Sequence, residues 1–73
     1  MYLRFEIYVV VIGEKRNNAL ITTVFNDAFA SYMMSKDEDK CIEVWDEGKR
    51  IDTYYTFDDF IKAGRVTTEI NNV

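Results

Sequence analysis

The 73-residue chain contains no histidine, no proline and a single cysteine, Cys41. One cysteine cannot form an internal disulfide, and a chain without histidine lacks the commonest ligand for a structural zinc ion and the usual general base at neutral pH. A serine or cysteine nucleophile would also lack its ordinary partner. We therefore expect no catalytic residues, no metal site and no cofactor, and we predict that the protein is not an enzyme.

Glycine is scarce as well, and Gly13, Gly48 and Gly64 stand too far apart to form a glycine-rich phosphate loop. The apolar run "YVVVIG" at residues 8–13 is too short for a membrane span or a signal peptide. A lone thiol without an export signal indicates a cytoplasmic protein with no membrane contact. No linker or low-complexity composition interrupts residues 1–73, so we expect a single domain.

Apolar residues, by contrast, make up 48% of the chain and aromatic residues 15%, which is ample for a folded core. A chain this short still buries only about 60% of the surface that it exposes when unfolded. Without disulfides or metals, packing or self-association must supply the missing stability, so we expect a homodimer. The net charge of −4 repels phosphate backbones and anionic lipids, and we expect no nucleic-acid partner.

Residues 2–12, "YLRFEIYVVVI", are rich in β-branched and aromatic side chains and predict a strand. Its odd positions, from Leu3 to Val11, are uniformly apolar, so we expect them to face the core. The even positions, among them Tyr8, Val10 and Ile12, would then face the opposite side. The charged segment 13–18 predicts a loop.

Residues 19–25 fit two structures. The run Ile21, Thr22, Thr23 and Val24 favours a strand, because branched side chains lose rotamer freedom in a helix. Apolar pairs that recur every four residues from Leu20 also fit one long helix over 18–36, giving a βαββα order. We favour the strand, followed by a helix that is capped by Asn26.

The segment "CIEVWDEGKRIDTYY" at 41–55 predicts a hairpin, because two alternating runs flank "DEGK" with a glycine in the turn. Regular pairing divides its side chains between two faces. The core face would hold Ile42, Val44, Ile51, Thr53 and Tyr55, and the other face Glu43, Trp45, Glu47, Arg50, Asp52 and Tyr54.

A short helix should follow, with Thr56 and Asp59 as a capping box, Phe60 and Ile61 facing inward and Gly64 as a left-handed cap. The tail from Arg65 onward is expected either to add an edge strand or to fray.

The phrase "TVFNDAF" at 23–29 returns as "YTFDDFI" at 55–61, thirty-two positions later. Each copy is interpreted as a strand exit followed by a helix entrance, with Phe25 or Phe57 packing over the first helical turn. Together these elements predict an α+β fold of order ββαββα, built from two hairpin-plus-helix units. We expect a small four-stranded antiparallel sheet with both helices on one face.

The function follows from the face opposite the helices, which would present aromatic and apolar side chains bordered by Glu6 and other charged residues. Interfaces favour tryptophan and tyrosine, and an exposed apolar patch calls for a partner. We therefore predict a non-catalytic protein-binding module. Its expected partner-binding residues are Tyr8, Val10, Glu43, Trp45, Glu47, Arg50, Asp52 and Tyr54.

The acidic rim of this surface suits a basic protein partner, and the aromatic patch suits a second copy of the chain. Phages and mobile elements use small acidic proteins of this kind to inhibit host or defence proteins, and the analogy predicts such an inhibitor. The alternative is a single-stranded nucleic-acid-binding or regulatory module, in which bases would stack on Trp45, Tyr54 and Tyr8. The acidic border and the absence of a basic groove argue against that alternative.

Overall fold

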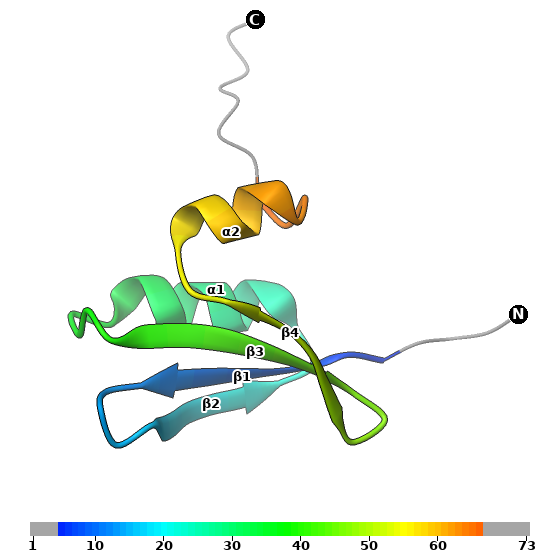
Figure 1. Ribbon diagram of the computed structural model, residues 1–73, viewed down its shortest axis with the longest axis horizontal. Coiled ribbons are helices and arrows are strands. Elements are labelled where there is room, and N and C mark those ends of the chain that lie inside the picture. Colours follow the sequence, from blue (N-terminus) through cyan, green and yellow to red (C-terminus); the bar gives the residue numbers. More distant parts are fainter. Residues whose placement is uncertain (1–4, 67–73) are drawn as a thin grey trace, which may run out of the picture.

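The computed structural model describes residues 5–66, which fold in the order ββαββα. The strands form one antiparallel sheet in the order β2-β1-β3-β4, and both helices lie on the same side of it (Figure 1). This arrangement confirms the predicted α+β fold and a strand in this region instead of one long helix over 18–36, which is wrong. The strand lies at Asn17–Thr22 and not at 19–25, because α1 already begins at Phe25. The elements are β1 (Ile7–Ile12), β2 (Asn17–Thr22), α1 (Phe25–Met34), β3 (Lys40–Asp46), β4 (Lys49–Tyr54) and α2 (Phe57–Lys62).

The two helices begin in different ways. In α2 the predicted capping box is present, because Thr56 accepts from the Asp59 amide and the Asp59 carboxylate accepts from the Thr56 amide. Helix α1 instead has Val24 at the N-cap position and no side-chain cap, so the role assigned to Asn26 is wrong. Phe25 and Phe57 are the first helical residues of α1 and α2, so the repeated phrases do occupy equivalent positions.

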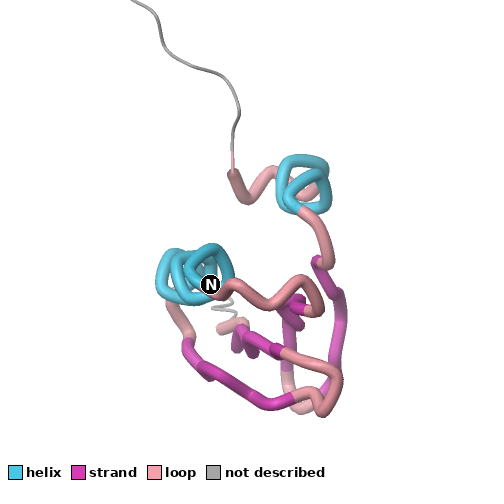
Figure 2. The backbone as a smooth tube through the Cα atoms, turned by 90° about the vertical axis from the view of Figure 1, so that its left-hand side faces the viewer, coloured by secondary structure: helices cyan, strands magenta, loops and turns pink. Residues whose placement is uncertain are grey.

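The core lies between the sheet and the two helices, which are cyan in Figure 2. At its centre is Phe60 of α2, which is completely buried. Its ring meets those of Tyr32 on α1 and Tyr54 on β4 edge to face, with centroids 5.0 and 5.3 Å apart. The buried core residues are Tyr8, Val10, Ala28, Tyr32, Ile42, Val44, Tyr54 and Phe60.

The predicted faces of β1 are reversed. Tyr8, Val10 and Ile12 belong to the core under the helices, whereas the odd position Ile7 is 41% exposed. Val11 is buried as predicted, but beside Cys41 and Arg16 and not under the helices. The alternation of side chains could not show which face of β1 is buried, because the second half of the strand is apolar on both faces. The tyrosine at position 8 can reach the core because its hydroxyl finds polar partners there, Glu6 and Arg65. Leu3 lies outside the described residues.

The register of the β3–β4 hairpin explains why residues of β4 lie on faces opposite to those predicted. Glu47 and Gly48 form the turn with positive φ angles of 52° and 77°, and Asp46 pairs with Lys49. The register then shifts, because Trp45 pairs with Arg50 but Val44 pairs with Asp52, which leaves Ile51 as an extra residue. A shift of one residue exchanges the two faces of a strand beyond it.

As a result, Tyr54 pairs with Ile42 and enters the core, while Asp52 lies on the helix side and lines a shallow groove with Asp59 of α2. Ile51 and Tyr55, which were expected in the core, are 44% and 59% exposed. The predicted placement of Tyr54 and Asp52 on the face away from the helices is therefore wrong.

Candidate functional site on the open sheet face

We call the side of the sheet opposite α1 and α2 the open face. It contains three of the predicted partner-binding residues, Glu43, Trp45 and Arg50, because β3 alternates and Val44 between them points into the core. Glu47 lies in the hairpin turn. The structure places the others on the helix side, namely Tyr8, Val10, Asp52 and Tyr54.

The centre of the open face is a hydrogen-bonded group that we call the Glu43 cluster, made of Glu43, Arg16, Trp45 and Arg50. One carboxylate oxygen of Glu43, Oε1, accepts a hydrogen bond from Trp45 Nε1 at 3.0 Å. The other, Oε2, accepts from Arg16 Nη2 at 2.7 Å and from Arg50 Nη1 at 3.3 Å. These three donors allow a carboxylate to be 93% buried on a face that no described helix covers.

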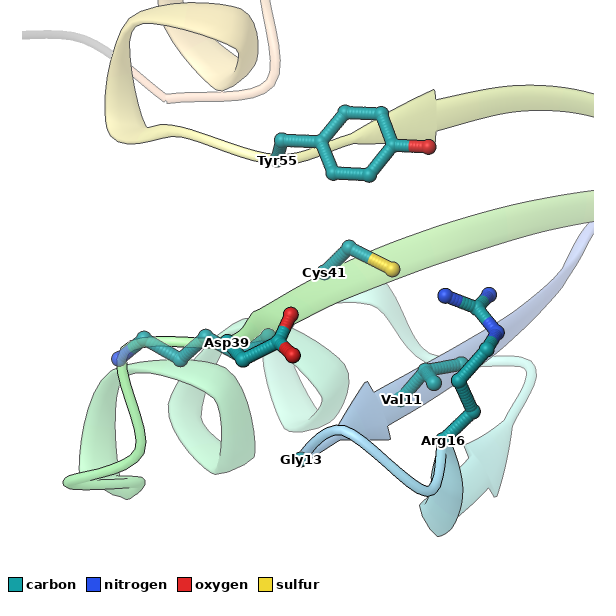
Figure 3. A pocket seen from close by; sticks show the side chains of 7 residues that line it. Val11, Gly13, Arg16, Asp39, Cys41 and Tyr55 are labelled. Atoms are coloured by element: carbon teal, nitrogen blue, oxygen red, sulfur yellow. The ribbon is translucent and has the colours of Figure 1, made fainter.

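Sequence reasoning missed Arg16, which lies in the turn between β1 and β2, 27 residues before its partner Glu43. The turn bends sharply at this residue, whose φ is 55°. Its side chain extends from the turn toward β3 (Figure 3). Such a contact depends on how the two hairpins meet in space, and no local pattern in the sequence announces it.

The cluster reverses the expected charge of this surface. Glu43 is buried, while the side chains of Arg16 and Arg50 are 55% and 52% exposed. Two guanidinium groups share one carboxylate, so the cluster carries a formal charge of +1. The prediction that Glu43 forms part of an exposed acidic rim is therefore wrong.

Apolar side chains adjoin the cluster. Ile7 pairs with Trp45 across β1 and β3, and Val9 lies between Glu43 and Ile21 of β2. Ile7 is 41% exposed and Ile21 is 61% exposed. The open face thus combines a half-buried indole, exposed aliphatic groups and two accessible guanidinium groups.

Beside Arg16 lies a small pocket of about 20 Å³, which has room for about one water molecule (Figure 3). Cys41 lines it and is 97% buried. Burial raises the pKa of the Cys41 thiol, and the neighbouring Arg16 opposes that shift only in part. The thiol therefore stays protonated at neutral pH and fits a packing role better than a nucleophilic one. The pocket is lined by Val11, Gly13, Arg16, Asp39, Lys40, Cys41 and Tyr55.

A second polar cluster lies on the helix side, at Arg65 just after α2. Its guanidinium group bonds Glu6 Oε1 at 2.7 Å and donates to the hydroxyls of Tyr8 and Tyr54, each at 3.2 Å. Burial acts to lower the pKa of Arg65, but the hydrogen bonds to Tyr54 and Glu6 outweigh it and raise that pKa. This cluster satisfies both tyrosine hydroxyls, and it places Glu6 away from the open face, where it was expected.

Residues 5–66 contain no group of three or more histidine, cysteine, aspartate or glutamate side chains arranged to hold a metal ion. In the same range, neither helix has the length and apolar character needed to cross a membrane. Comparison of the chain with protein-family models, with curated proteins and with solved structures finds no match.

Proposed function

We propose that this chain is a non-catalytic protein-binding module and that the open face is its contact surface. The observation that carries the proposal is Trp45, held on a sheet face that no described helix covers and flanked by exposed Ile7. Tryptophan and arginine are the residues most enriched among those that dominate binding energy at interfaces. The Glu43 cluster supplies one indole and two guanidinium groups at one place.

The small size of the chain supports self-association through the same face. A standard interface takes about 800 Å² from each partner, which is about one seventh of the 5621 Å² of accessible surface here. A two-fold symmetric contact would cover the exposed Ile7 and Ile21 of both copies and add the buried area that a small core lacks. The same surface would allow the module to act as an inhibitor by occupying a functional surface of another protein.

The test compares the wild-type chain with Trp45→Ala and Ile21→Ser, using sedimentation equilibrium over a range of concentrations and affinity capture from a lysate of the source organism or its host. We expect both substitutions to weaken self-association or capture. Met34→Ser is the matched control, since Met34 is 81% exposed on α1, away from the open face. If Met34→Ser has the same effect as Ile21→Ser, or neither open-face change has any effect, the open face is not the contact surface.

Single-stranded nucleic-acid binding is the second candidate, and one observation favours it: two half-exposed arginines adjoin Trp45. It has less support than protein binding, because Tyr8 and Tyr54, two of the three rings expected to stack bases, are buried under the helices. An electrophoretic shift assay at low salt tests it. Retention of short oligonucleotides by the wild-type chain but not by Trp45→Ala would favour this second function.

A further inference from the structure

We propose that the Glu43 cluster binds a carboxylate, so that the protein partner presents an acidic side chain to Trp45, Arg16 and Arg50. This inference rests on the proposed protein-binding function and names the chemistry of the partner. It replaces the basic partner that the overall composition suggested.

Arg16 and Arg50 have more hydrogen-bond donors than Glu43 uses. A guanidinium group has five N–H donors and no acceptor, whereas the bonds to Glu43 engage Nη2 of Arg16 and Nη1 of Arg50. Both side chains are more than half exposed, and each guanidinium group has more N–H donors than its bond to Glu43 uses. A second carboxylate could therefore bind above the two arginines without displacing Glu43.

Glu43 preorganises the two arginine side chains. Glu43 is buried and anchored by the Trp45 indole, so it holds both arginine side chains in place before a ligand arrives. Fixing a long side chain in advance lowers the conformational entropy lost on binding. Arginine also pairs with carboxylates through two parallel N–H bonds, which gives the contact direction as well as charge.

The charge of the Glu43 cluster and its apolar neighbours favour one kind of ligand. The local charge of +1 suits one anionic group, while the net charge of −4 on the whole chain opposes a polyanion such as nucleic acid. The neighbouring Ile7 and Trp45 offer apolar contacts on the same face. An acidic residue flanked by apolar or aromatic residues in a protein segment matches this combination.

The experiment titrates the full ¹⁵N-labelled chain with the blocked peptide acetyl-Leu-Asp-Phe-Asp-Leu-amide and with its counterpart that has asparagine in place of aspartate. Nuclear magnetic resonance follows the indole N–H of Trp45 and the side-chain N–H of Arg16 and Arg50. We expect saturable shifts of these signals with the acidic peptide only. Arg16→Gln and Arg50→Gln should each weaken binding about tenfold, the usual effect of losing one charged hydrogen bond.

Lys15→Gln is the matched control, because it removes the same charge from the same exposed turn beside Arg16. We expect it to leave the affinity unchanged, and a loss equal to that of Arg16→Gln would reduce the effect to general electrostatics and overturn the inference. Equal binding of the two peptides, no shift with either, or stronger shifts at the same signals with a short oligonucleotide would also overturn it. The backbone amide spectrum of each variant verifies that it is folded.

The proposed function can survive that failure. If Trp45→Ala abolishes capture or self-association while Arg16→Gln and Arg50→Gln leave it intact, the open face is the interface but does not recognise an acid. If Trp45→Ala, Ile21→Ser, Arg16→Gln and Arg50→Gln all leave capture and self-association unchanged, both proposals fail together.

Discussion

At the scale of single residues, Glu43 is the only charged residue among residues 5–66 that is buried. A buried carboxylate is costly unless hydrogen bonds replace its water, and here one indole and two guanidinium donors do so. Trp45 also owes part of its orientation to Glu43, since the indole N–H donates to that carboxylate. The surface proposed for binding is thus stabilised by an acid that lies beneath it.

We expect Glu43→Gln to lower the free energy of unfolding by about 1–3 kcal/mol, because the amide retains one acceptor for Trp45 but loses the charge that binds two arginines. Urea unfolding followed by circular dichroism measures the change. Glu38→Gln, the same substitution at an exposed loop position, is the control and should be nearly neutral. Equal stabilities for the two variants would mean that the cluster contributes little to folding.

Asp59 gives a prediction at acidic pH. Hydrogen bonds from the backbone amides of Tyr55 and Thr56 lower the pKa of the Asp59 carboxyl below its ordinary 3.8. The unfolded chain therefore takes up this proton first, and the stability contributed by the ionised cap is present above pH 3.8 and lost as the pH falls through the folded-state pKa.

We expect Asp59→Asn to flatten the fall in stability below pH 3.8, measured by urea unfolding at a series of pH values. Asp58→Asn is the control, because it removes a carboxylate from the same helical turn. The Asp58 carboxylate bonds the Lys62 side chain and caps no backbone amide in the described contacts. A parallel loss of pH dependence in both variants would contradict the role assigned to the cap.

At the scale of elements, the sequence predicted all four strands and both helices, because turn residues, capping residues and apolar periodicity are local signals. The Thr56 capping box and the glycine turn at Gly48 are examples. It was harder to predict which face each strand buries. In β1 both faces are apolar near Val10, and in β4 the extra residue Ile51 exchanges the faces of every residue beyond it.

The candidate site was therefore predicted in part. Trp45 and Arg50 lie between the turn and the register shift, so regular pairing placed them on the same face correctly. Tyr54 lies beyond the shift and was assigned to the wrong face. Arg16 could not be predicted at all, because its contact with Glu43 joins two separate hairpins.

Helix α2 has six residues and one fully buried side chain, so its attachment depends on Phe60. We expect Phe60→Ala to lower the free energy of unfolding by about 3–5 kcal/mol, through lost contacts and the cavity left behind. Phe57→Ala is the control, since Phe57 occupies the same helix but is 41% exposed. Urea unfolding measures both, and a smaller loss for Phe60→Ala than for Phe57→Ala would contradict the assigned core.

At the scale of the whole molecule, the margin of stability is small. Chains of this size typically have about 4–11 kcal/mol of unfolding free energy, at 0.05–0.15 kcal/mol per residue. The core contains Tyr8, Tyr32 and Tyr54, and all three hydroxyls have partners. The Tyr32 hydroxyl donates to the Tyr55 carbonyl at 2.8 Å, and Arg65 donates to the other two. A core so rich in phenols should be sensitive to alkali.

Burial raises the pKa of both Tyr8 and Tyr32 above 10.0, with the acceptor Glu6 adding to the shift at Tyr8. The unfolded chain therefore loses these protons first. The stability from the neutral phenols is fully present below pH 10.0 and is lost as the pH rises through the folded-state pKa values.

We expect unfolding above pH 10.0 to coincide with a cooperative rise in tyrosinate absorbance, and Tyr32→Phe to shift that transition to higher pH. Tyr55→Phe is the control, because the Tyr55 side chain is 59% exposed. If tyrosinate forms gradually while the circular dichroism of the fold is unchanged, the phenols ionise without unfolding and the coupling is absent.

The salt bridge between Glu6 and Arg65 joins the residue just before β1 to the segment that follows α2. The beginning and the end of the described chain are thus within reach of one short linker, on the side of the sheet away from Trp45. A circular permutant that joins these ends and opens the exposed loop at 36–39 should keep the fold. Such a rearranged chain would move both termini from the side of the Glu6–Arg65 bridge to the loop between α1 and β3.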